Sequence, residues 1–142
     1  MSRFFNTAGP VVPADHYVVP LEKRLDVDEL LMLIQQKKYF VLHAPRQTGK
    51  TSCLLALMRK LNAEGKYTCL YINIEAAQAV RENVEQALQI IVGELARREQ
   101  NTLKTSFIAD HRKQVVKKDP FSALQAILSL WASHHEKPLV LL

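Results

Sequence analysis

The segment FVLHAPRQTGKTSCLL, residues 40–55, constrains the fold of this chain more than any other. A short stretch of aromatic and apolar residues runs into Ala44, and the loop that follows contains Gly49. From Cys53 onward, apolar residues recur at the spacing of one helix face. This order predicts a strand buried on both faces, a tight loop and an amphipathic helix over about residues 50–63.

The loop itself matches a known chemical pattern. Residues 44–51 fit the phosphate-loop pattern G-x-x-x-x-G-K-[ST], with Ala44 in place of the first glycine. Gly49 leaves room for a phosphate, Lys50 supplies a positive charge for the β- and γ-phosphates, and Thr51 offers a hydroxyl to Mg²⁺. The pattern therefore predicts that ATP or ADP binds with Mg²⁺, with Lys50 as a catalytic residue and Thr51 as the metal ligand. The candidate nucleotide-binding residues of the loop are Ala44, Pro45, Arg46, Gln47, Thr48, Gly49, Lys50, Thr51 and Ser52.

Helix-type and strand-type patterns alternate along the sequence. The expected helices lie at about 26–36, 50–63, 80–95 and 121–135, and the expected strands at 37–44, 67–74 and 139–142. Residues 100–119 have no clear period and are predicted to form a long connection. The alternation predicts an α/β fold, a P-loop NTPase-type parallel sheet with helices on both faces, truncated after the start of the third strand.

The first 25 residues differ from the rest. They contain three of the six prolines and several aromatic residues, so we expect an extended N-terminal arm (residues 1–25) that packs on the core. The remainder, residues 26–142, is expected to be the N-terminal part of a single ATPase domain. Cys53 and Cys69 lie in apolar segments without metal-ligand spacing and are expected to be buried thiols.

Composition excludes some classes of protein. The apolar fraction of 48% and the charged fraction of 23% are those of an ordinary globular protein. No apolar run approaches the ~18 residues that a membrane span requires, and the N-terminus lacks the apolar core of a signal peptide. We therefore expect a cytoplasmic protein with no membrane partner.

The segment PRQTGKTSCLLALMRKL, together with YVVPLEKRLDVDELLMLI before it, resembles the AAA-type and STAND-type P-loop ATPases, most specifically at residues 39–57. The resemblance implies that Tyr17 and Val18 lie against the adenine; an alternative is that Tyr17 packs into the core. In such ATPases an apolar strand like LVLL, residues 139–142, precedes the Walker B Asp-Glu pair. The resemblance thus implies that the Walker B and sensor elements lie beyond the chain end.

One carboxylate occupies a suggestive position. Glu75 follows YINI at the end of the second expected strand, where ligands gather in open α/β sheets. It resembles the catalytic Glu that recombinase-type ATPases place at the end of the equivalent strand. Glu75 is therefore a candidate catalytic residue; the alternatives are a surface residue or the N-cap of the following helix.

Several functions remain open at this point. The first is ATP binding by part of an AAA-like ATPase, and the second is a STAND-type switch that holds ADP and responds to a partner. The third is a DNA-associated ATPase that uses the basic run HRKQVVKK, residues 111–118. A nucleotide kinase is disfavoured because no lid arginine cluster is visible. Besides a nucleotide, the candidate partners are a second copy of the chain and, less strongly, a nucleic acid.

Overall fold

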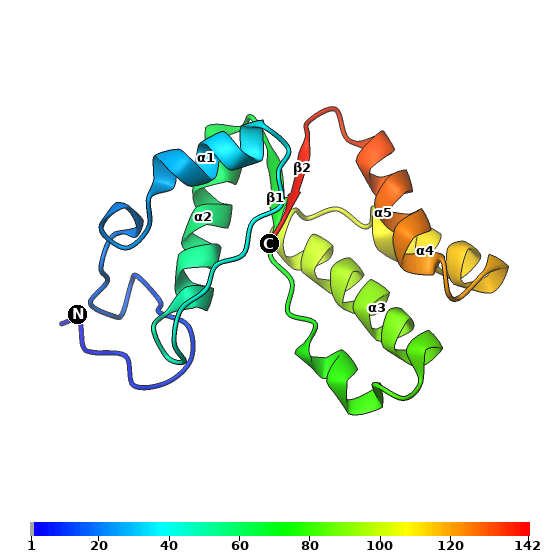
Figure 1. The fold of residues 1–142 in the computed structure, drawn as a ribbon, viewed down its shortest axis with the longest axis horizontal. Helices are drawn as coiled ribbons and strands as arrows, with labels where there is room; N and C mark the ends of the chain where they lie inside the picture. The colour runs from blue at the N-terminus through cyan, green and yellow to red at the C-terminus, as the bar shows by residue number, and fades with distance from the viewer. Residues whose placement is uncertain (1) are drawn as a thin grey trace. The chain divides into compact units, whose positions relative to one another are not determined.

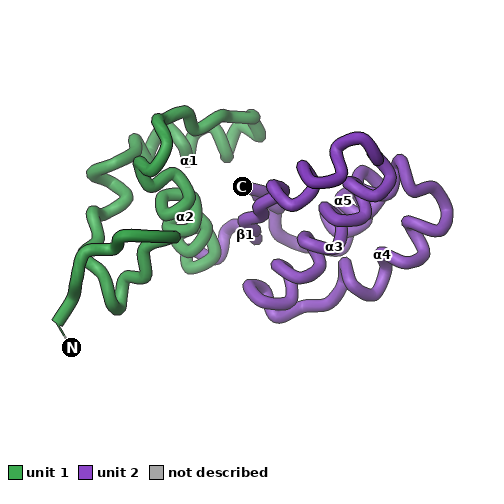
Figure 2. The backbone as a smooth tube through the Cα atoms, turned by 90° about the horizontal axis from the view of Figure 1, so that it is seen from below, with its two compact units in different colours: residues 1–63 green, residues 64–142 purple. Residues whose placement is uncertain are grey.

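The computed structural model describes residues 2–142, which fall into two compact units (Figure 2). The first unit ends at Ala63 and the second runs from Glu64 to Leu142. The elements, in chain order, are η1 (Leu21–Lys23), α1 (Val27–Gln35), α2 (Lys50–Glu64), β1 (Thr68–Leu70), η2 (Glu75–Val80), α3 (Val84–Thr102), α4 (Phe107–Lys118), α5 (Ala123–His134) and β2 (Leu139–Leu141) (Figure 1).

The predicted fold class is wrong. Over residues 2–142 the structure is mostly helical, and its only sheet consists of β1 and β2, each three residues long. Within this range there is no P-loop NTPase-type parallel sheet with helices on both faces. Of the three expected strands, those at 67–74 and 139–142 form in shortened versions, and the one at 37–44 does not form.

The segment at 37–44 fails as a strand because nothing pairs with it. Residues 38–45 have no regular secondary structure, and the side chains of Tyr39 and Val41 are 103% and 89% exposed. A strand requires a neighbour for its backbone N–H and C=O groups as well as an apolar composition. Residues 37–44 have the apolar composition of a strand, but no described segment pairs with their backbone.

In the first unit, α1 and α2 begin and end largely where local signals place them. The carboxylate of Asp26 caps α1 by accepting the backbone N–H of Glu29 at 3.0 Å. The apolar stripe of α2 is buried as expected. The buried apolar residues of this unit are Leu21, Val27, Ile34, Cys53, Leu57, Met58 and Leu61.

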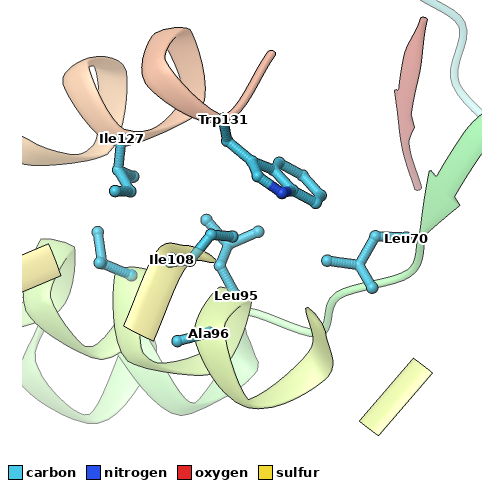
Figure 3. Packing of buried hydrophobic residues seen from close by; sticks show 7 residues of the cluster. Leu70, Leu95, Ala96, Ile108, Ile127 and Trp131 are labelled. Carbon is cyan, nitrogen blue, oxygen red and sulfur yellow. The ribbon is translucent and has the colours of Figure 1, made fainter. Parts of the chain in front are cut away.

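The second unit has a continuous core. Trp131 and Ile127 on α5 point toward Leu95 on α3 and Ile108 on α4, and Leu70 of β1 completes the cluster (Figure 3). All of these side chains are at most 2% exposed. Three helices and a strand therefore share one set of buried side chains.

β1 and β2 are parallel, as predicted for these two segments. Thr68 pairs with Leu139, Cys69 with Val140 and Leu70 with Leu141. The chain between the two strands contains α3, α4 and α5, which lie beside them (Figure 1). Cys69, like Cys53 in the first unit, is a buried thiol, which confirms that prediction.

The prediction of a long connection over 100–119 is also wrong, because α4 occupies most of it. Glu99, a residue of α3 with 0% exposure, explains how α4 begins. One oxygen of its carboxylate accepts the backbone N–H of Ile108 and the other accepts the hydroxyl of Thr105, both at 2.8 Å. The start of α4 is thus stabilised by a side chain of another helix, which a search for local caps does not detect.

The arm folds back on itself. Phe4 and His16 form an isolated parallel bridge, with the backbone N–H of Phe4 donating to Asp15 at 3.0 Å and that of Tyr17 donating to Phe4 at 3.0 Å. Phe4 and Phe5 are 57% and 79% exposed. The arm therefore belongs to the first unit, while its aromatic rings remain largely in contact with solvent.

Candidate functional site

The loop before α2 has a backbone that local sequence alone would disfavour. Gln47 has a φ of 57° and Gly49 a φ of 79°, both in the left-handed region. Glycine adopts this conformation without a steric penalty, whereas a residue with a side chain, such as Gln47, is less stable in it by roughly 1–2 kcal/mol. The hydroxyl of Thr48 donates to the carbonyl of Pro45 at 2.8 Å and closes the turn.

The backbone N–H groups of this loop have no hydrogen-bond acceptor among the described residues. From Arg46 to Ser52, no N–H donates to an acceptor in residues 2–142; the first to do so is that of Cys53, which bonds Gly49 at 3.0 Å. Residues 46–48 and 51 are exposed, and the other three are half-buried, so water reaches the loop. A run of N–H groups without protein acceptors at the start of a 15-residue helix suits an anion.

Lys50 lies at the first position of α2 and turns back over the loop. Its ammonium group donates to the carbonyls of Ala44 and Pro45, both at 2.6 Å. Both acceptors are neutral, so the positive charge of Lys50 has no carboxylate partner in the described chain. Thr51, the predicted metal ligand, is exposed on the next position of the helix.

Ser52 connects the loop to the arm. Its hydroxyl oxygen accepts the backbone N–H of Val11 at 3.1 Å. Tyr17 and Val18, the residues predicted to contact adenine, are 54% and 45% exposed, and the ring of Tyr17 lies 4.9 Å from that of Phe5. Tyr17 is therefore not packed into the core, and its contact with adenine stays a prediction.

Sequence reasoning missed Arg24. Its guanidinium group donates through Nη2 to the carbonyl of Thr48. A Cβ atom placed on Gly49 would lie 2.7 Å from Nη1 and 2.8 Å from Nη2 of Arg24. The loop is thus covered at Gly49 by a side chain from a distant point in the sequence. No local signal could have found this contact, because it depends on the tertiary position of the segment between η1 and α1.

A hollow of about 500 Å³ is lined by Arg24, Asp26 of the α1 cap and Lys60 of α2, among others. Its lining does not include the residues of the loop. The loop is therefore an open surface feature and is not the floor of this hollow.

Glu75 belongs to the second unit, whereas the loop belongs to the first. It is exposed and is the first residue of η2, where its backbone N–H donates to the side-chain oxygen of Asn73 at 2.8 Å. The N-cap of α3 is Asn83, so Glu75 does not cap the long helix. A catalytic role for Glu75 stays a prediction.

The second unit has its own polar hollow, of about 430 Å³, lined by Glu99 and the adjacent His134 and His135 among others. Burial, followed by the neighbouring His134, lowers the pKa of His135, and the charge of Glu99 opposes the shift. Among residues 2–142, no cluster of His, Cys, Asp or Glu has the arrangement of a metal site. The hollow is therefore a polar cavity built around the start of α4.

Comparison with known proteins gives no family for the chain: no family model, no curated protein and no solved structure matches it. Within the described part of the chain, no helix is long and apolar enough to cross a membrane.

Proposed function

We propose that the chain binds a nucleoside polyphosphate, with ATP or ADP as the nucleotide and Mg²⁺ as the counter-ion, through residues 44–52. The observation that carries the proposal is the run of unused backbone N–H groups from Arg46 to Ser52, beside the ammonium group of Lys50. An anion placed there would accept several N–H groups and would face the positive end of the α2 dipole.

The current partners of Lys50 fit a ligand-free state. Two carbonyls hold its ammonium group, and both are neutral acceptors. Hydrogen bonds between charged groups are shorter and stronger than those to neutral groups, so a phosphate would compete well with these carbonyls. The loop-and-helix sequence resembles that of AAA-type and STAND-type ATPases, which supports ATP as the nucleotide. Hydrolysis is not part of the proposal, and the cytoplasm remains the expected compartment.

The direct test is calorimetric titration of the protein with Mg·ATP, before and after Lys50→Ala. We expect the substitution to weaken binding at least about tenfold, the effect of losing one charge-assisted hydrogen bond. Arg59→Ala is the matched control, because Arg59 is an exposed cation on the same helix. Equal affinities for the wild-type and Lys50→Ala proteins would contradict the proposal.

A second candidate function, contact with nucleic acid, is favoured by α4. The basic run predicted from the sequence forms the end of this helix, with Lys113 and Lys117 exposed one turn apart. With Arg112 they line a hollow of about 430 Å³. DNA affinity should then fall steeply with salt, and the double variant Lys113→Ala/Lys117→Ala should reduce the salt slope by about two. A slope that is unchanged in the double variant would rule out this face.

A further inference from the structure

Arg24 occupies a position that packing does not explain. It follows η1 and is exposed. Its guanidinium group nevertheless reaches Thr48 and fills the space that the missing side chain of Gly49 leaves open. A side chain at position 49 would displace the guanidinium group from this place. The glycine therefore admits the guanidinium group as well as the backbone angle.

The charge of Arg24 is uncompensated. The one hydrogen bond of its guanidinium group in the described chain goes to a neutral carbonyl, and no carboxylate pairs with this group there. The ammonium group of Lys50, on the residue after Gly49, is also held by neutral carbonyls alone. The loop is therefore contacted by two cations, neither of which has a carboxylate partner in the described chain, and a bound anion would offset both charges.

We propose that Arg24 is the second phosphate-binding cation of this site, so that the site selects the polyphosphate chain of its ligand. This inference rests on the proposed function, because it requires that residues 44–52 bind phosphate. A guanidinium group presents five donors in a planar fork and can hold two phosphate oxygens at once. One of these donors is engaged by Thr48, and the others are available to a ligand.

A site with two phosphate-binding cations distinguishes ligands by the number of their phosphate groups. Lys50 bonds to Ala44 and Pro45, whereas Arg24 bonds to Thr48. In this proposal the two cations bind different phosphates, so a monophosphate engages Lys50 but not Arg24. Triphosphates should therefore bind much more tightly than monophosphates. Inorganic tripolyphosphate should share this advantage, because neither cation requires a base or a ribose.

A different role for Arg24 makes different predictions. If the guanidinium group only braced the carbonyl of Thr48, its removal would loosen the loop for every phosphate ligand. The affinity for AMP and for ATP would then fall by the same factor. A second phosphate-binding cation instead affects the longer chains selectively.

The experiment is calorimetric titration of the full chain, in the presence of Mg²⁺, with ATP, AMP and inorganic tripolyphosphate. Arg24→Ala should weaken ATP and tripolyphosphate about tenfold to a hundredfold and AMP less than about threefold. Arg24→Lys should recover part of the loss, because it restores the charge without the planar fork. Lys23→Ala is the matched control: it removes an adjacent exposed cation and should change each affinity less than about twofold.

Each outcome decides the question. Equal losses for AMP and ATP would assign Arg24 to bracing the loop and would overturn the inference. Unchanged affinities in Arg24→Ala, with a loss in Lys50→Ala, would overturn the inference but leave the proposed function intact. Absence of binding by the wild-type protein would overturn both. Circular dichroism of each variant checks that the helices are retained.

Discussion

The two units differ in how they use their apolar residues. In the second unit, α3, α4, α5 and β1 bury one shared cluster around Trp131 (Figure 3). The first unit has fewer buried side chains and exposes many large apolar ones, including Phe5, Tyr39 and Val41. The candidate phosphate loop belongs to the first unit. Stability and candidate chemistry are therefore concentrated in different parts of the chain.

This contrast has a physical basis. A packed core fixes backbone positions, whereas a loop that binds an anion must leave its N–H groups without protein acceptors. Local opening is easiest where few apolar contacts oppose it, so we expect faster hydrogen exchange around the loop than in α3 or α5.

The largest effect is expected from Trp131→Ala. Removal of this buried side chain should lower the free energy of unfolding of the second unit by about 3–5 kcal/mol. Trp131→Phe is the milder control, since the indole N–H has no hydrogen-bond partner among the described residues. Hydrogen exchange should increase in residues 64–142 and remain unchanged in the loop at 44–49. Equal loosening of both units would show that they are one cooperative structure.

Glu99→Gln should produce the next largest effect. The carboxylate accepts hydrogen bonds from Ile108 and Thr105 while fully buried, and an amide group would place a donor against one of these donors. We expect a loss of about 1.5–3 kcal/mol in chemical unfolding, with α4 as the first helix to exchange. The matched control is Glu85→Gln, the same chemical change at an exposed position in the first turn of α3, which should alter the stability by less than about 1 kcal/mol. If both variants behave alike, Glu99 does not anchor α4.

Removal of a helix cap should have a smaller effect on stability, and each unit has one cap that can be compared. Asp26 caps α1 in the first unit and Asn83 caps α3 in the second, each accepting one backbone N–H at 3.0 Å. Replacement of either by Ala should cost about 1 kcal/mol of local stability. Hydrogen exchange at the first turn of each helix should locate the loss in the unit that was changed. Faster exchange in the other unit as well would contradict the view that the two units open independently.

The smallest effect concerns pH. Burial lowers the pKa of His135 in the folded chain below its ordinary value, so the unfolded chain binds this proton at a higher pH. The free energy of unfolding should therefore fall as the pH is lowered through the ordinary histidine pKa, near ~6.5, toward the folded pKa. His135→Gln should flatten this dependence. The slope can be measured by urea unfolding at several pH values.

The features that were predicted correctly depend on near neighbours in the sequence. The extent of α2 and the burial of its apolar stripe both arise from the spacing of residues along one helix. The strand at 37–44 and the connection at 100–119 were wrong for one shared reason. A strand needs a partner, and α4 needs the carboxylate of Glu99, and neither requirement can be read from the segment itself.

In the candidate site, too, local features could be expected from the sequence, whereas contacts between distant segments could not. Gly49, which the pattern of residues 44–51 singles out, has a φ of 79°, an angle that a glycine adopts without strain. The left-handed Gln47 and the guanidinium group of Arg24 were not predicted. The sequence pattern names candidate residues by their chemistry, but it does not show which side chains the fold brings next to them.

The parallel pairing of β1 with β2 has a mechanical consequence. Force applied to the two ends of the second unit would pull β1 by its first residue and β2 by its last. Because the strands are parallel, this load shears the whole ladder at once, including the bond from Thr68 to Pro138 at 3.0 Å and that from Leu142 to Leu70 at 2.9 Å. The helices between the strands are shielded until the ladder breaks. The two-stranded sheet should therefore determine how much force the second unit resists before it unfolds.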